Sequence, residues 1–141
     1  MKKHYAQTIF GLSIAGLLFS GYLSFYKLLT GQCALGETCP FFLGHPACWY
    51  GFALFVLLTA FSTRALLTGS TTCRYSLGIA SFVGTVFSGS FIVPDVTTWL
   101  ASGKSYGLIL PSCVYGFVVF LTIFVLVIVE AATSQEPVQS K

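Results

Sequence analysis

The residues of this sequence with the greatest chemical potential are its five cysteines. The phrase PACWYGF, which contains Cys48, returns as PSCVYGF around Cys113, 65 residues later. Cys33 and Cys39 form a close pair that encloses five residues, ALGET. Cysteine pairs in exposed segments form disulfides or exchange them through mixed disulfides. The pattern therefore indicates thiol–disulfide chemistry.

Composition places the cysteines in a membrane protein. Of the 141 residues, 55% are hydrophobic and only 8% are charged, against about 25% charged in soluble domains. A helix crosses a bilayer with ~20 apolar residues, and the chain has four stretches of about that length without Asp, Glu, Lys or Arg: 4–26, 38–63, 75–94 and 105–129. These stretches lack the alternation of barrel strands. We expect an all-α membrane protein with four helices at about 7–29, 46–63, 75–94 and 107–130.

The domain organisation follows from the same stretches. Residues 1–132 are expected to form one four-helix transmembrane domain, and the polar tail 133–141 to be disordered and cytoplasmic. The first apolar run continues to Tyr26 without a small-x-small cleavage site, which favours a retained helix over a signal peptide.

The basic residues give the expected orientation. Lys2 and Lys3 precede the first helix, and Arg64 and Arg74 flank the loop between the second and third. The positive-inside rule then makes both termini cytoplasmic, as in a bacterial inner-membrane protein. Only Cys73 faces the cytoplasm in this topology, and the other four cysteines lie on the oxidising side, where disulfides form.

The repeated phrase belongs to a longer internal repeat. The offset of 65 that aligns the two phrases also aligns GLSIAG, residues 11–16, with SLGIAS, residues 76–81. The first and third helices run in the same direction. The pattern therefore predicts a four-helix bundle built as two parallel-repeat helical hairpins, with a pseudo-two-fold axis along the membrane normal.

The repeated phrase itself has a structural and a chemical interpretation. Proline starts a helix, tyrosine favours the membrane boundary and glycine allows close helix packing. These structural reasons do not explain the cysteine. A helix N-terminus stabilises a thiolate, and Cys48 and Cys113 each follow a helix-starting proline by two residues. Diagonal helices lie ~11–14 Å apart, whereas a disulfide needs Cα atoms within ~7 Å. A direct Cys48–Cys113 bridge is therefore disfavoured unless the bundle is compressed at that end, and a loop cysteine could reach either one.

Two segments resemble the vitamin K epoxide reductase (VKOR) family, particularly its short bacterial members. Residues 16–39, GLLFSGYLSFYKLLTGQCALGETC, are similar to the family's first helix and its loop cysteine pair. Residues 44–51, GHPACWYG, are similar to its G-x-P-x-x-x-x-G opening of the second helix. The resemblance implies a four-helix bundle around a quinone pocket. It also implies that electrons pass between extracytoplasmic thiols, such as those of a thioredoxin-like protein, and a membrane quinone.

The resemblance assigns roles to individual residues and also meets a departure. Cys33 and Cys39 would form the shuttle pair, and Cys113 would lie at the family's redox position. Cys48 is the further candidate for a catalytic thiol, although its place on the diagonal helix argues against that role. The residues near the quinone would be Phe41 and Phe42, in a short lid that also includes Leu43, together with Tyr115 and Gly116. The family places C-x-x-C at the outer end of the fourth helix, whereas this chain has Cys113-Val114-Tyr115-Gly116. The prediction is thus a VKOR-like thiol–disulfide oxidoreductase whose activity is altered or lost at the second thiol.

Other functions fit the sequence less well. The spacing of Cys33, Cys39, His45 and Cys48 matches no compact zinc site, so no metal is expected. The two histidines lie on opposite sides of the membrane, which disfavours haem ligation. No span has an ionisable residue in its central part, which disfavours a transporter. The strongest alternative is a non-catalytic four-helix subunit of a larger membrane complex. We expect membrane lipid as a partner, together with either an extracytoplasmic thioredoxin-like protein or a larger membrane complex, and we expect no nucleic acid.

Overall fold

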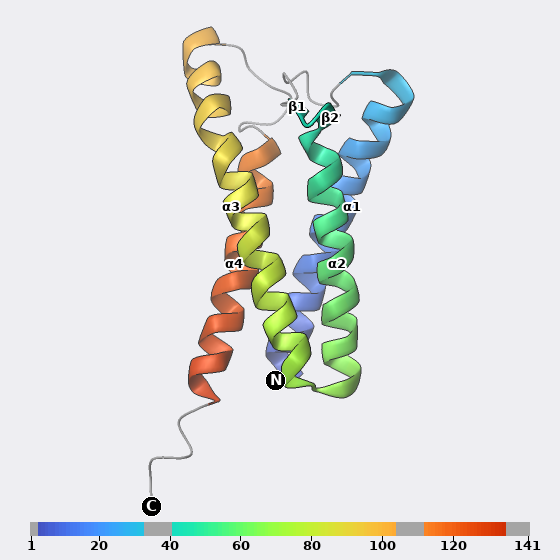
Figure 1. The fold of residues 1–141 in the computed structure, drawn as a ribbon, viewed down its shortest axis with the longest axis vertical. Coiled ribbons are helices and arrows are strands. Elements are labelled where there is room, and N and C mark those ends of the chain that lie inside the picture. The colour runs from blue at the N-terminus through green and yellow to red at the C-terminus, as the bar shows by residue number, and fades with distance from the viewer. Residues whose placement is uncertain (1–2, 33–40, 104–111, 135–141) are drawn as a thin grey trace, which may run out of the picture.

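In a computed structural model, the described part of the chain forms four long helices and one small β-hairpin (Figure 1). The structure describes residues 3–32, 41–103 and 112–134. The helices are α1 (Lys3–Thr30), α2 (Ala47–Thr68), α3 (Thr71–Ser102) and α4 (Ser112–Thr133). All four are long and apolar enough to cross a membrane. The predicted all-α, four-helix architecture is confirmed.

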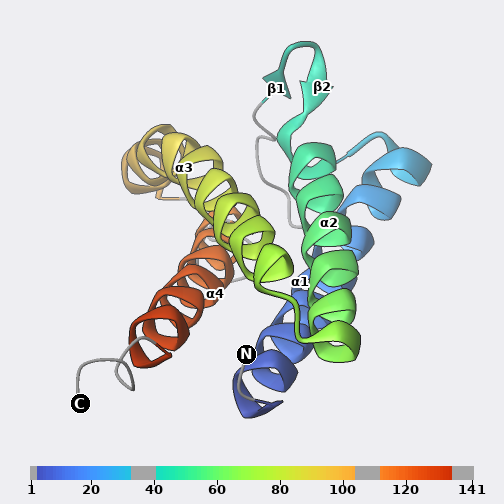
Figure 2. The ribbon, with the colours of Figure 1, turned by 60° about the horizontal axis from the view of Figure 1, so that its bottom comes forward.

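The helices run alternately up and down, so α1 and α3 end where α2 and α4 begin (Figure 1). We call this end of the bundle, which carries the β-hairpin, the β end, and the opposite end the N-terminal end. Helix α1 packs mainly on α2, and α3 mainly on α4, as Figure 2 shows from another side. The two pairs meet along α2 and α3 and, less extensively, along α1 and α4. Helices α2 and α4 are therefore diagonal neighbours.

The β-hairpin at the β end joins β1 (Phe41–Phe42) to β2 (His45–Pro46) in antiparallel register, with Phe42 opposite His45. Its two-residue turn has φ values of 49° at Leu43 and 83° at Gly44. Two positive φ angles are what a tight type I′ turn requires, and glycine meets that requirement without strain. Pro46 is then the N-cap of α2, so the hairpin leads directly into the helix.

The helices extend further than the charge-free stretches predict. Helix α2 continues to Thr68, whose hydroxyl donates to the Arg64 carbonyl at 2.8 Å. It ends at Gly69, which has a left-handed φ of 61° and caps the helix through its N–H to the Ala65 carbonyl. Helix α3 begins only two residues later, at Thr71. Polar residues thus prolong both helices beyond the apolar runs, so the loop between α2 and α3 is shorter than expected.

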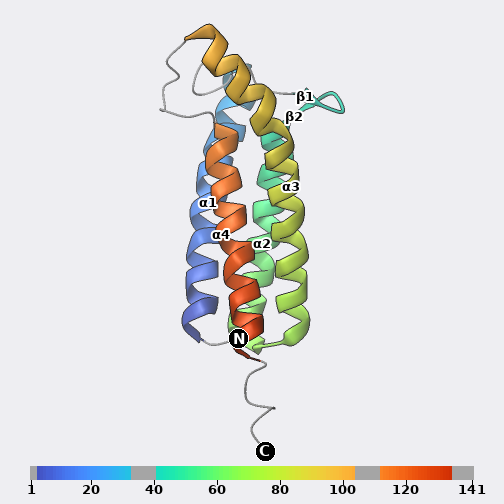
Figure 3. The same ribbon diagram turned by 90° about the vertical axis from the view of Figure 1, so that its left-hand side faces the viewer.

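Helix α3 also passes through Pro94, where the sequence predicts its end. Proline removes one backbone hydrogen bond, to the carbonyl four residues earlier, and bends a helix more often than it stops one in an apolar bundle. Beyond the proline, the Thr97 hydroxyl donates to the carbonyls of Val93 and Pro94, each at 2.9 Å. Figure 3 shows the last turns of α3 leaning across the top of the bundle.

The centre of the bundle is a stack of two phenyl rings from the diagonal helices. Phe55 of α2 and Phe120 of α4 have ring centroids 4.3 Å apart and planes inclined by 15°. A Cβ atom on Gly16 would overlap the Phe55 ring, and a Cβ on Gly84 would overlap the Phe120 ring. Each ring therefore fits only because the facing helix carries glycine.

The buried faces of α1 and α3 carry matching residues that are 68 positions apart. Ile9 and Leu77 are fully buried, and so are Ser13 and Ser81. Both serine hydroxyls donate to the carbonyl four residues earlier, at 2.8 and 2.7 Å. The alignment of GLSIAG with SLGIAS uses an offset of 65. The residues of α1 and α3 that are buried in the same way are therefore offset by three residues more than in that alignment.

Candidate functional site

The cysteines of the repeated phrase both lie at the β end, each as the second residue of its helix. Cys48 follows Ala47 at the start of α2, and Cys113 follows Ser112 at the start of α4. Both side chains are half-buried. On each helix the cysteine is followed at i+3 by glycine and at i+7 by a ring of the central stack. The spacing of three and seven residues places all three on one helix face.

These two faces border a partly open cavity of about 60 Å³, to which all four helices contribute. Its lining is mainly aromatic and small, with three buried or half-buried hydroxyls. The lining residues are Phe19, Ser20 and Leu23 of α1; Ala47, Cys48, Gly51 and Phe55 of α2; Phe87, Ser88 and Phe91 of α3; and Ser112, Cys113, Gly116 and Phe120 of α4.

The lining divides into matching halves. Each lining residue of α1 has a counterpart 68 positions later on α3, as Ser20 has Ser88. Each lining residue of α2 has a counterpart 65 positions later on α4, as Cys48 has Cys113. The two cysteines therefore occupy corresponding places around one cavity. They lie on diagonal helices, as the sequence predicts, and line the cavity from α2 and α4.

An aromatic cluster covers the side of this cavity between α2 and α3. Phe42 of the β-hairpin makes edge-on contacts with Phe87 and Phe91, at centroid distances of 5.7 and 6.1 Å. Its ring also meets Tyr50 of α2 edge-on at 5.5 Å. Phe87 and Phe91 line the cavity, so Phe42 lies directly behind its wall. The role of Phe41, Phe42 and Leu43 as a lid stays a prediction.

The other predicted quinone-side residues lie at differing distances from the cavity. Gly116 lines it, and a Cβ atom there would be 3.8 Å from the Ser88 hydroxyl, its nearest neighbour. Tyr115 does not line it, but its ring lies 6.0 Å from that of Phe19, which does. The backbone of Phe41 is in β1, while its side chain lies outside the described part of the chain.

The predicted shuttle pair, Cys33 and Cys39, lies outside the described residues. Cys73 has a free thiol at the start of α3, at the N-terminal end and far along the bundle from the cavity. Within residues 3–32, 41–103 and 112–134, no group of three or more His, Cys, Asp or Glu side chains could hold a metal ion.

The cavity does not fit a quinone ring as it stands. Pockets for organic ligands usually have volumes of about 300–1,000 Å³, whereas this one has about 60 Å³, enough for a few water molecules. Two of its walls are the stacked rings of Phe55 and Phe120, which hold each other in place. The quinone that the VKOR resemblance implies therefore stays a prediction.

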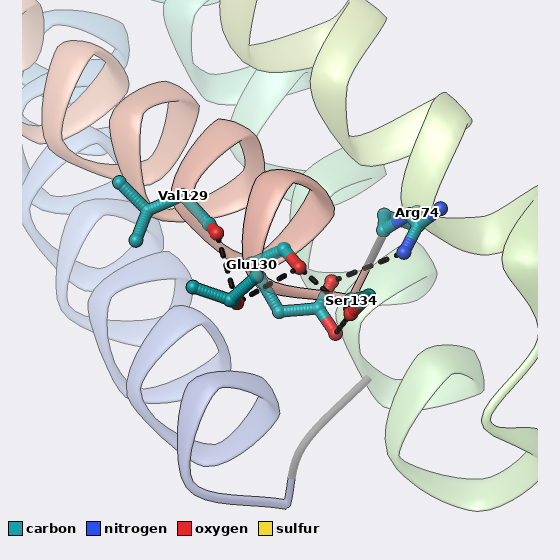
Figure 4. A network of polar contacts seen from close by, with 5 residues as sticks. Arg74, Val129, Glu130 and Ser134 are labelled. Carbon is teal, nitrogen blue, oxygen red and sulfur yellow. Dashed lines mark hydrogen bonds and ion pairs between the residues drawn. The ribbon is translucent and has the colours of Figure 1, made fainter. Parts of the chain in front are cut away.

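A second polar site lies at the N-terminal end and was missed from the sequence. Arg74 Nη1 of α3 lies 3.5 Å from Glu130 Oε2 of α4, and the Glu130 side chain is only 1% exposed (Figure 4). The Ser134 hydroxyl donates to the Glu130 backbone carbonyl at 2.7 Å and to Oε1 at 3.3 Å. In the sequence, Arg74 directly precedes the charge-free stretch 75–94 and Glu130 directly follows the stretch 105–129. In the expected topology these two positions lie at the same end of the bundle, and their opposite charges were the signal that could have indicated an ion pair.

Comparisons with protein-family models, with curated proteins and with solved structures find no match for this chain.

Proposed function

We propose that the chain is an integral membrane protein that exchanges thiols and disulfides at the cavity of its β end. The observation that carries this proposal is that Cys48 of α2 and Cys113 of α4 line the same cavity. The resemblance of residues 16–39 and 44–51 to the VKOR family supports the same chemistry. The matched lining supports an origin of the bundle in two copies of one helical hairpin, arranged as a parallel repeat.

The exchange needs two thiols. The VKOR family has its second thiol at the position of Gly116, and in this chain Cys48 would provide the second thiol instead. The Cys113 thiolate attacks a substrate disulfide, forms a mixed disulfide and releases one substrate thiolate, which takes up a proton. The Cys48 thiolate then attacks the Cys113 sulfur, releases the second substrate thiolate and leaves a Cys48–Cys113 disulfide. Two electrons pass to the substrate in this direction, and two pass back in the reverse reaction.

The substrate of this exchange would come from the same side of the membrane. The first candidate is the Cys33–Cys39 pair, which would exchange in turn with an extracytoplasmic thioredoxin-like protein. Lys3, Arg64 and Arg74 all lie toward the N-terminal end. That end would therefore face the cytoplasm and the β end the outside, in a bacterial inner membrane.

Thiol trapping tests this proposal. Membranes that contain the chain are quenched with acid, and thiols are alkylated with a maleimide that adds visible mass, before and after reduction. We expect Cys48→Ser and Cys113→Ser each to remove one reducible cysteine pair or to accumulate a mixed disulfide. The matched control, Cys73→Ser, changes only the total thiol count. Resistance to alkaline carbonate extraction tests insertion separately.

Gly116 favours the alternative of a non-catalytic subunit, because it stands where the VKOR family has its second thiol. That function predicts that Cys113 stays reduced under oxidation and that no variant traps a mixed disulfide. This result would contradict the exchange proposal and leave the four-helix scaffold as a packing element of a larger membrane complex.

A further inference from the structure

A second hollow of the molecule lies on its outer surface, between α3 and α4 at the N-terminal end. It is a groove of about 370 Å³ with almost entirely apolar walls. Gly78 creates its depth, because a Cβ atom there would lie 3.5 Å from Val127 Cγ1, in ordinary contact. Phe82 and Ile128 stand at its sides and are half exposed. In a membrane, this surface would face lipid chains.

One end of the groove carries a cation. Arg74 lines the groove, and its guanidinium carbon lies 5.9 Å from the ring centre of Tyr75, which is 67% exposed. The Arg74 side chain is 16% exposed, and its Nη1 lies 3.5 Å from Oε2 of Glu130, which is buried and does not line the groove. An arginine has five N–H donors, so donors other than the one facing Glu130 remain for a ligand in the groove.

The corresponding surface of the other helix pair is built differently. At the positions 68 residues earlier, α1 has Phe10 in place of Gly78 and Ala6 in place of Arg74. A phenyl ring thus replaces the glycine that gives the groove its depth, and a buried methyl group replaces the cation. At these described positions, α1 therefore offers neither the glycine nor the cation that α3 contributes to the groove.

We propose that this groove binds one anionic phospholipid, with an acyl chain along its apolar walls and the phosphate at Arg74. Its volume lies within the ~300–1,000 Å³ of ligand pockets, and arginine is well suited to phosphate. Basic pockets between membrane helices on the cytoplasmic side hold anionic head groups, and an exposed tyrosine marks the head-group level. The inference rests on the membrane insertion of the proposed function and not on its thiol chemistry.

Native mass spectrometry of the full chain in detergent tests the lipid. Phosphatidylglycerol and phosphatidylcholine with identical acyl chains are added separately, and the lipid-bound fraction is measured. We expect phosphatidylglycerol to be retained preferentially and Arg74→Gln to weaken its binding about fivefold, the effect of one basic residue near an anionic lipid. The matched control is Arg64→Gln, because Arg64 is exposed on α2 near the same end and does not line the groove.

A second variant guards against misfolding of Arg74→Gln. Gly78→Leu keeps the Arg74–Glu130 pair and fills the groove, so it should abolish retention of phosphatidylglycerol. Equal retention of the two lipids by the wild-type chain would overturn the proposal, as would equal effects of Arg74→Gln and Arg64→Gln or unchanged retention in Gly78→Leu. A chain released by alkaline carbonate would contradict membrane insertion itself, whereas loss of thiol exchange would leave the lipid result intact.

Discussion

At the β end, α1–α2 and α3–α4 contribute the same kinds of residue to one cavity, while at the N-terminal end they differ. Ala6 and Ala65 of the first pair are both buried, and the corresponding positions of the second pair are Arg74 and Glu130. The shared positions are those where packing across the bundle leaves little choice. The differing positions show where one pair has acquired a charge and a groove without disturbing that packing.

The largest effect is expected from breaking the ion pair of the second helix pair. Arg74→Ala leaves the buried Glu130 carboxylate without its cation, which should lower the free energy of unfolding by about 3 kcal/mol. Arg74→Ala with Glu130→Ala copies the alanines of the first pair and should recover most of this loss. Unfolding in mixed detergent micelles, followed by circular dichroism, measures both.

Arg64→Ala is the matched control, since this arginine is exposed and should change stability by less than about 0.5 kcal/mol. A double variant as unstable as Arg74→Ala alone would show that α3 and α4 do not tolerate the packing of the first pair at this end.

A smaller and equal effect is expected in both pairs at the glycines of the central stack. Gly16→Ala and Gly84→Ala drive a methyl group into Phe55 and Phe120, and overpacking of this kind costs about 1–3 kcal/mol. The unfolding free energy should fall by the same amount in both variants.

Gly11→Ala is the control for this comparison, because a Cβ atom there meets no heavy atom within 4 Å. Phe55→Leu should partly rescue Gly16→Ala by removing the ring that the methyl group meets. Strongly unequal losses at Gly16 and Gly84 would argue against equivalent packing in the two pairs.

The buried serines should give a still smaller difference. Ser13→Ala and Ser81→Ala each remove one hydroxyl that donates to a helix carbonyl, a hydrogen bond with a net contribution of about 1 kcal/mol. Thermal unfolding of the two variants should shift in the same direction and by the same amount. A loss of stability in only one of the two variants would contradict equivalent packing of Ser13 in α1 and Ser81 in α3.

The smallest change in stability is expected where a second thiol is added. Gly116→Cys places a side chain toward Ser88 without overlap and should alter the unfolding free energy by less than about 0.5 kcal/mol. It recreates C-x-x-C with Cys113, so we expect a new reducible pair in maleimide trapping. Gly51→Cys, the counterpart on α2, is the comparison, and an introduced thiol that never oxidises in Gly116→Cys would count against redox chemistry at this end.

The sequence predicts the elements of this fold better than their relations. The charge-free stretches locate all four helices, and Pro46 marks the start of α2. Helix α3 passes through Pro94, which a hydropathy pattern does not predict, because proline is tolerated within apolar membrane helices. The register between α1 and α3 is equally hidden, because a helix with apolar residues on every side matches its repeat at more than one offset.

The sequence draws attention to the cysteines of the cavity but does not contain the arrangement of its walls. Cys48 and Cys113 were identified from the repeated phrase, but their common cavity depends on glycine positions in two other helices. Arg74 and Glu130 lie near the ends of their helices, and which way such side chains face is decided only by the packing. The roles of Cys33 and Cys39 stay predictions.

The stack of Phe55 on Phe120 has a consequence for the two compartments that the bundle would separate. Both rings are almost fully buried, and they close the floor of the cavity across the axis of the bundle. A file of water molecules needs polar partners along its path, and two stacked phenyl faces provide none. If the bundle spans a membrane as proposed, the stack would act as an insulator, so that thiols could gain and lose protons at one end of the bundle without a leak of ions to the other.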